Sequence, residues 1–235
     1  MTAIARGLSG WEATTALARL SLRRMLRGKT LWVTLAIGLL PCLIAVFAQR
    51  NQSALEAWAS TLKLALPLIA IIPPILVATS LSDEIDEKTS AYLWSRALPR
   101  WSVVTGKLLA LAPVAATLSA LGLLLSWAIF GGPAAVPAAV VGRTLLGVFA
   151  GGIAASVVSA MFATVAPRFA VPLAIGWLLL DSMVGALSMN LHVIAVSFGP
   201  RALASGTQVV TGVISLAVLT AIALTIAVRR IDRIE

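Results

Sequence analysis

The residues with the clearest potential for chemistry in this 235-residue chain lie in one polar stretch, residues 80–107, which reads SLSDEIDEKTSAYLWSRALPRWSVVTGK. It contains four of the nine acidic residues: Asp83, Glu84, Asp86 and Glu87. A short apolar tip follows, formed by Tyr92, Leu93 and Trp94. Acidic side chains stabilise the positive N-terminal end of a helix, and an apolar tip rimmed by charge is typical of protein contacts. The stretch therefore predicts recognition of a basic protein partner; the alternative is a solvated loop with its tryptophans at the lipid headgroups.

A second candidate is Asp181, which stands alone in the apolar run VPLAIGWLLLDSMVGALSM. It follows the predicted start of that run by roughly 12 residues, or about 18 Å of helix. A carboxylate in hydrocarbon costs at least about 2.5–3.5 kcal/mol on insertion scales, so the side chain must face a polar environment. Two interpretations stay open: a residue of a substrate path or subunit interface, or a structural Asp bonded to a helix.

Two prolines, Pro73 and Pro74, interrupt the apolar run that precedes the acidic stretch and free backbone carbonyl groups there. We expect a static kink, and the alternative is a hinge that transmits motion from the adjacent acidic stretch. Both prolines are also candidates for a substrate path. Further along, small residues recur every four positions: Gly147, Gly151, Ala155, Ser159 and Ala163. Because small faces let helices approach closely, we expect this row to pack inside one subunit, with a contact between subunits as the alternative.

The remaining chemistry-bearing residues are too few for catalysis. The chain has one histidine, His192, and one cysteine, Cys42, so neither a metal cluster nor a disulfide framework is expected. The segment RGKT at 27–30 resembles the end of a phosphate-binding loop, but Arg23 stands where that motif requires glycine. We therefore expect no catalytic residue, no metal and no cofactor bound by this chain, and an intramembrane enzyme is not favoured.

Composition indicates the elements that must position these residues. Hydrophobic residues make up 60% of the chain and charged residues 11%. Runs of about 20 apolar residues match a membrane-spanning helix, and they lack the alternation of a barrel strand. We predict an all-α polytopic membrane protein with six spans. These are residues 30–48, 62–82, 107–130, 143–166, 169–191 and 207–228.

Positive charge predicts the orientation of the spans. Four of the 18 Lys and Arg residues would lie on one side of the membrane, and the remaining 14 on the other. The four are Arg50, Lys63, Arg143 and Arg201. The positive-inside rule then places both termini in the cytoplasm and the chain in the bacterial cytoplasmic (inner) membrane. Because these flanks account for the net charge of +9, no nucleic-acid partner is expected.

The spans divide the chain into three regions. Residues 1–29 contain WEATTALARLSLRRMLRGK, whose apolar residues can share one helical face with arginines beside it. We predict a cytoplasmic amphipathic helix in the headgroup layer, followed by the six-span domain, residues 30–228, and a cytoplasmic tail, residues 229–235. No cytoplasmic piece is long enough to bury a core of its own, so any catalytic cytoplasmic machinery must be another polypeptide.

The segment DEIDEKTSAYLWSRALPRWSVVTGKLLA resembles the loop after the second span of ABC-2-type transporter permeases. The matching residues are Asp83, Glu84, Asp86, Thr89, Arg100, Trp101, Gly106 and Lys107. Lys88 stands where that family usually has glycine, and Ala97 where proline is common. The basic N-terminal helix, the six spans and the two cytoplasmic termini resemble the same family along nearly the whole chain.

The resemblance implies that residues 83–106 form a coupling segment on which a separate ATP-binding subunit docks. The residues that would make this contact are Asp83, Glu84, Asp86, Glu87, Thr89, Tyr92, Leu93, Trp94, Arg100 and Trp101. It also implies two copies of the ATPase, which would hold ATP and Mg, and a second permease copy, identical or related. Residues 191–206 would form a short extracellular re-entrant segment, and the span that contains Asp181 would help to line a path between the permease copies.

The leading hypothesis is therefore the membrane subunit of an ATP-driven transporter, an exporter of a hydrophobic or amphiphilic substrate. The alternative is a secondary transporter that runs on an ion gradient. Such a transporter would normally need several ionisable groups inside the membrane, and Asp181 alone gives it little support.

Overall fold

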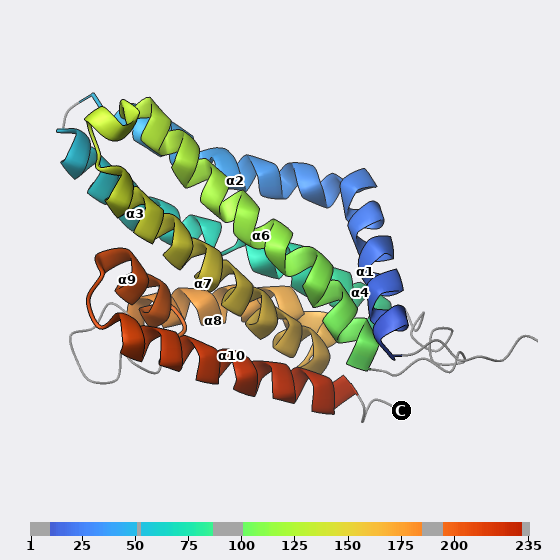
Figure 1. The fold of residues 1–235 in the computed structure, drawn as a ribbon. Helices are drawn as coiled ribbons and strands as arrows, with labels where there is room; N and C mark the ends of the chain where they lie inside the picture. Colours follow the sequence, from blue (N-terminus) through green and yellow to red (C-terminus); the bar gives the residue numbers. More distant parts are fainter. Residues whose placement is uncertain (1–9, 51–52, 87–100, 185–194, 232–235) are drawn as a thin grey trace, which may run out of the picture.

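The computed structural model describes residues 10–50, 53–86, 101–184 and 195–231 (Figure 1). These residues form helices and no strands, and six of the helical stretches are long and apolar enough to cross a membrane. The prediction of an all-α chain with six spanning helices is confirmed at this level. The elements are α1 (Gly10–Arg27), α2 (Lys29–Ala48), α3 (Ala54–Ile69), η1 (Pro74–Ala78), α4 (Thr79–Asp86), α6 (Trp101–Ile129), η2 (Gly132–Ala134), α7 (Ala138–Val165), η3 (Pro167–Phe169), α8 (Ala170–Val184), α9 (Phe198–Ser205) and α10 (Val209–Ile231).

Three spanning stretches begin earlier than the apolar runs had indicated. They are Ala54–Ile85, Trp101–Ile129 and Ala138–Val165. Their polar or amphipathic flanks continue the helix beyond the apolar core. Helix α3 begins with a capping box in which the Ser53 N–H donates to the Glu56 carboxylate at 3.3 Å, and the Ser53 hydroxyl donates to the same oxygen at 2.7 Å. Residues 101–106, which the sequence assigned to the coupling segment, form the first turns of α6.

The two longest uninterrupted helices, α6 and α7, pack on each other at the centre of the bundle (Figure 1). Small residues make the approach possible: a Cβ on Gly152 would lie 2.9 Å from the Cα of Ala116. On another face of α6, a Cβ on Gly122 would collide with the carbonyl group of Gly38 in α2. The helices α8, α9 and α10 pack around α7. The small residues of α7 thus pack within one chain, as expected.

The second spanning stretch is broken near its middle. After α3 the chain makes a two-residue turn at 70–71, and the helix resumes through Ile72 and Pro73 into the π-helix η1 and then α4. Because Pro73 and Pro74 lack the N–H groups that a continuous helix would use, the break follows from their chemistry. The two halves have different neighbours: α3 packs mainly against α2, whereas η1 and α4 contact α6, α7 and α8.

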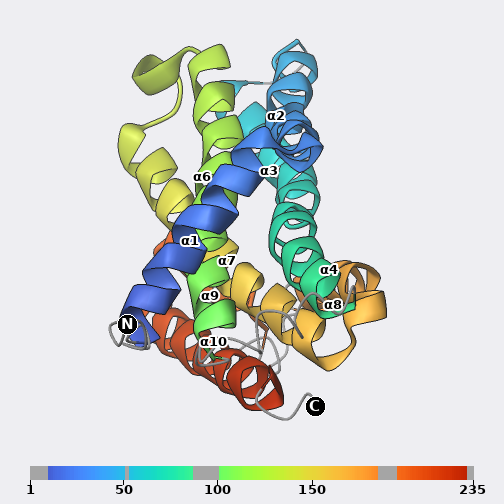
Figure 2. The ribbon, with the colours of Figure 1, turned by 90° about the vertical axis from the view of Figure 1, so that its right-hand side faces the viewer.

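The N-terminal helix α1 lies at one end of the bundle, steeply inclined to α2 (Figures 1 and 2). It crosses α6 at Gly106, where a Cβ would lie 2.9 Å from the carbonyl oxygen of Thr14 and 3.0 Å from the Cβ of Leu17. Its other side leaves Trp11 and Leu20 more than half exposed. These features fit an amphipathic helix, and its contact with the headgroup layer stays a prediction.

The C-terminal end of α10 lies at the same end of the bundle as α1 (Figure 1). The short helix α9 lies at the opposite end (Figure 1). It lies within the predicted re-entrant segment, residues 191–206. Glycines let it pack closely: a Cβ on Gly147 of α7 would collide with the carbonyl group of Pro200, and one on Gly199 would lie 2.8 Å from the Gly212 oxygen of α10. The side of the membrane on which each end lies stays a prediction.

Candidate functional site

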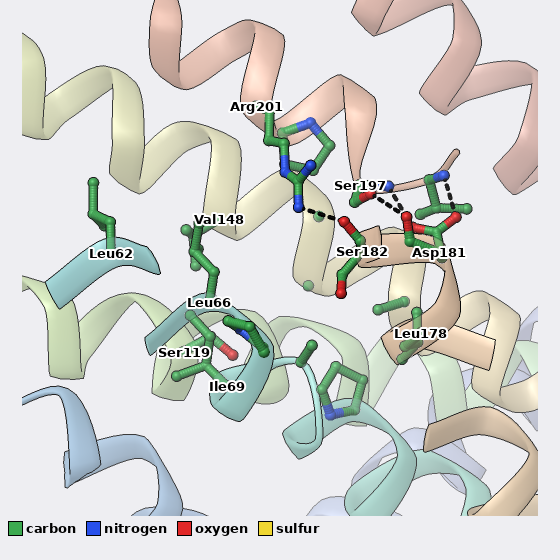
Figure 3. A pocket seen from close by; sticks show the side chains of 18 of the residues that line it. Leu62, Leu66, Ile69, Ser119, Val148, Leu178, Asp181, Ser182, Ser197 and Arg201 are labelled. Carbon is green, nitrogen blue, oxygen red and sulfur yellow. Dashed lines mark hydrogen bonds between the residues drawn. The ribbon is translucent and has the colours of Figure 1, made fainter. Parts of the chain in front are cut away.

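A cavity of about 530 Å³ lies between α3, α7, α8 and α9 (Figure 3). Its volume falls within the range of about 300–1,000 Å³ that is typical of small-molecule sites. Most of the lining is apolar, and the polar groups gather on the side formed by α8, α9 and the turn before α9 (Figure 3). This combination of an apolar body and a polar side makes the cavity the leading candidate for a binding site.

The cavity exists because α3 diverges from α7, α8 and α9 beyond the break in the second span. Leu62, Leu66 and Ile69 follow helical spacing and give α3 one apolar face towards the space. Across from them, α7 contributes Gly151, Gly152 and Ala155, whose side chains are too small to fill it. Of the two prolines, Pro73 lines the cavity and Pro74, buried in η1, does not. The place of either proline on a substrate path stays a prediction.

Asp181 lies on the polar side of the cavity and is only 7% exposed. Its Oδ1 accepts a hydrogen bond from the N–H of Val196 at 2.7 Å, and its Oδ2 accepts one from the N–H of Ser197 at 2.8 Å. The Ser197 hydroxyl donates to the carbonyl oxygen of Asp181 at 2.9 Å. Because these N–H groups precede the first turn of α9, Asp181 fastens the start of that helix to α8. The residue therefore has a structural partner, and its place on a substrate path stays a prediction.

Two cationic side chains, Arg201 and Lys63, complete the ionisable lining. Arg201 extends from α9, and its Nη2 donates to the carbonyl oxygen of Ser182 at 2.7 Å (Figure 3). Lys63 extends from α3. Neither forms an ion pair in the described part of the chain, although Asp181 lies close enough to attract Arg201 electrostatically.

A second charged cluster lies where α4 meets α6, at the end of the bundle that holds α1. The Nζ of Lys107 is 2.8 Å from Oε2 of Glu84 and also donates to the backbone carbonyl group of Ser80. Arg24 of α1 approaches the other oxygen of Glu84 at 3.8 Å. The Lys107 side chain is 3% exposed and that of Glu84 is 21% exposed. The cluster therefore ties α4 firmly to α6 and more weakly to α1.

The predicted coupling residues divide into three groups. Asp83 is exposed on α4, Asp86 is the last residue of that helix, and Trp101 is 37% exposed at the start of α6. Glu84 is directed towards Lys107 inside the chain, which the sequence did not indicate. The others lie outside the described residues: Glu87, Thr89, Tyr92, Leu93, Trp94 and Arg100. The contact with a partner ATPase therefore stays a prediction.

The sequence did not indicate a site role for some residues of these sites. Lys107 carried a usable signal, because it lies three positions after Val104 and four before Leu111, on the buried face of α6. Arg201 and Lys63 carried no such signal, because they line the same cavity only through the return of α9 into the bundle and the divergence of α3.

Comparison with protein-family models gives no match, and comparison with curated proteins finds no significantly similar sequence. The resemblance to ABC-2-type permeases therefore depends on the segment at residues 83–110 and on the six-span plan.

Proposed function

We propose that this chain is the membrane-spanning permease subunit of an ATP-driven transporter, an exporter of a hydrophobic or amphiphilic substrate whose ATPase is a separate protein. The observation that supports this most is the acid-bearing end of α4. It lies at the same end of the bundle as α1 and the C-terminal end of α10, exposes Asp83, and is fastened to α6 through Glu84 and Lys107 (Figure 1). A partner that binds there acts on a junction of two spans.

Helix α4 connects that junction to the cavity. Helix α4 continues through η1 to Pro73, which lines the cavity. A displacement of α4 therefore changes the position of one cavity wall. ATP binding or hydrolysis in the partner can drive such a change only if the partner binds the two permease conformations with different affinities.

The proposed complex contains two permease copies, identical or related, and two ATPase copies. ATP and Mg belong to the ATPase, and the permease sequence holds no phosphate-binding loop. The helices α2, α8 and α10 leave large apolar side chains exposed, so these faces suit lipid or a second copy. In this proposal the chain lies in the bacterial cytoplasmic membrane with both termini in the cytoplasm, as the distribution of Lys and Arg indicates.

Co-purification tests the proposal directly. The tagged chain, expressed together with its neighbouring genes, is purified in mild detergent, and ATP hydrolysis of the eluate is measured. We expect an ATPase to co-elute, with hydrolysis abolished when the nucleotide-binding lysine of that partner is replaced. An eluate in which no ATP-hydrolysing protein accompanies the chain contradicts the proposal.

A secondary transporter is the remaining alternative, and the cavity is where its coupling ion would bind. A cation site needs free oxygen ligands, but both carboxylate oxygens of Asp181 accept hydrogen bonds from backbone N–H groups. The other ionisable groups of the lining, Lys63 and Arg201, are cations and would repel such an ion. Uptake driven by an imposed proton or sodium gradient, without any ATPase, would favour this alternative.

A further inference from the structure

The charges of the cavity lining are unequally distributed. Its ionisable residues are Lys63, Arg201 and Asp181, so the lining carries net positive charge. The apolar remainder includes Leu66, Ile69 and other residues of α3, α7 and α8. A mostly apolar cavity whose lining carries net positive charge is complementary to a molecule with an anionic head and an apolar body.

The single acid offsets one of the two positive charges but forms no ion pair with either cation among the described residues. Both oxygens of Asp181 are already hydrogen-bonded to the N–H groups of Val196 and Ser197. Arg201, by contrast, has one hydrogen bond among the described residues, from Nη2 to Ser182. The guanidinium group has five N–H donors in a planar fork, so most of its donors remain for a ligand.

We infer that this cavity binds an amphiphile with an anionic headgroup, a phosphate or carboxylate joined to an acyl-type apolar tail. The headgroup lies between Arg201 and Lys63, and the tail lies along Leu66, Ile69 and the small residues of α7. Only the further step, that this amphiphile represents the class of transported substrate, rests on the proposed transporter function.

Arg201 and Lys63 suit this ligand in different ways. The planar guanidinium group can bind two oxygens of a phosphate or carboxylate at once, which fixes the orientation of the headgroup. The ammonium group of Lys63 is exposed and on a flexible stem, so it can follow headgroups of different size. A zwitterionic headgroup brings a cation into the same field and is disfavoured.

The inference is tested with the full-length chain in a neutral detergent. Phosphatidylglycerol or phosphatidylcholine with the same acyl chains is added in small amounts, and bound lipid is counted by native mass spectrometry. Because hydrogen bonds to charged groups are strong, we expect phosphatidylglycerol to bind about ten-fold more tightly or better. Lys63→Gln with Arg201→Gln should remove this preference.

A matched double variant controls for charge. Arg50→Gln with Arg143→Gln removes the same charge from the same predicted side, at positions that do not line the cavity. It should keep the preference for phosphatidylglycerol. If Arg201→Gln prevents folding, Lys63→Gln alone decides the matter, because Lys63 is exposed and has no ion-pair partner among the described residues. It should lower the preference several-fold, and an unchanged preference in this variant overturns the inference.

Two further measurements distinguish binding of the headgroup from binding of the tail. Inorganic phosphate at equal concentration should not displace the bound lipid, and Ala155→Leu, which narrows the apolar part, should weaken binding of both lipids. Displacement by phosphate, or unchanged lipid binding in Ala155→Leu, overturns the assignment to an amphiphile. These measurements use no ATPase, so absence of lipid binding rejects the ligand class while co-purification still decides the transporter function.

Discussion

At the scale of single residues, Asp181 shows how an acidic side chain is accommodated in an apolar helix. Its two oxygens meet two N–H groups at the start of α9, at 2.7 and 2.8 Å. Those N–H groups have no partner within the helix, so the carboxylate and the helix start satisfy each other. The sequence showed that Asp181 needed a polar environment, but it could not show which backbone groups supply it, since they lie 15 and 16 positions further along.

Asp181→Asn should therefore be poorly tolerated even though it preserves shape. The amide supplies one acceptor and turns a donor towards an N–H group, so one buried donor loses its partner. We expect the free energy of unfolding to fall by about 1–3 kcal/mol, measured from the midpoint of thermal denaturation in detergent. Asp83→Asn, at an exposed acid, is the matched control and should leave the midpoint nearly unchanged. If the Asp181→Asn variant is as stable as the parent, this role of Asp181 is contradicted.

The pair of Glu84 and Lys107 gives a second prediction, in which the two partners are unequal. Glu84→Met leaves a 3% exposed ammonium group without its carboxylate, and removing one member of a buried pair costs about 3–5 kcal/mol. Lys107→Met should cost less, because the Glu84 carboxylate is 21% exposed and Arg24 is 3.8 Å away. Thermal denaturation of both single variants and of the double variant measures the difference.

The double variant Glu84→Met with Lys107→Met supplies the control for that comparison. Because it removes both charges, it should be more stable than Glu84→Met alone. If the two single variants lose the same free energy of unfolding, and the two losses add in the double variant, then the two side chains do not stabilise each other.

At the scale of helices, the crossing of α1 over α6 depends on Gly106. The Cβ of a side chain there would lie 2.9 Å from the carbonyl oxygen of Thr14 and 3.0 Å from the Cβ of Leu17, which is closer than van der Waals contact. Gly106→Leu should therefore displace α1, and trypsin should cleave at Arg19 and Arg23 several-fold faster than in the parent chain, because a displaced helix opens more easily. Gly176→Leu is the matched control, since a Cβ at that helical position has nothing within 4 Å. Equal cleavage rates in the two variants contradict the dependence on Gly106.

The elements themselves were largely predictable from the sequence. Apolar runs of sufficient length indicated six spanning helices, and Pro73 with Pro74 indicated the break in the second. The helix ends were less accurate, because the capping box at Ser53 and the amphipathic start of α6 extend the helices past their apolar cores.

The cavity could not be predicted in the same way. Its walls come from α3, α6, α7, α8 and α9, and its size depends on how far α3 diverges from α7 and α9, which no local pattern determines. Lys63 and Arg201 are 138 positions apart in the sequence, so only the tertiary structure brings them to one lining. For Glu84 the sequence pattern predicted a surface for a partner protein, but the side chain forms an ion pair with Lys107 of α6.

At the scale of the whole molecule, coupling to a partner should depend on the remaining acids of α4. Asp83→Lys with Asp86→Lys should lower the amount of co-purified ATPase and stop transport, because both charges are reversed at the proposed docking surface. Asp83 is exposed and Asp86 ends α4, so membrane insertion and thermal stability should change little. Pull-down yield, ATP hydrolysis and thermal denaturation are measured on the same preparation.

Asp232→Lys with Glu235→Lys provides a matched control with the same total charge change outside α4. It should leave the yield of co-purified ATPase near that of the parent. If the variant at Asp83 and Asp86 binds the ATPase and transports as well as the parent, the acid-bearing end of α4 is not where coupling occurs.

The two halves of the second span have different main neighbours, although η1 also contacts α2, and this has a thermodynamic consequence. Because α3 packs with α2 while η1 and α4 pack with α6, α7 and α8, the bend at residues 70–71 sets the distance between opposite walls of the cavity. A ligand that binds more tightly to conformations with one bend angle shifts the population towards those conformations. Linkage then requires a reciprocal effect. A protein that holds α4 in one orientation changes the binding free energy of the cavity ligand, and the cavity ligand changes the binding free energy of that protein by the same amount.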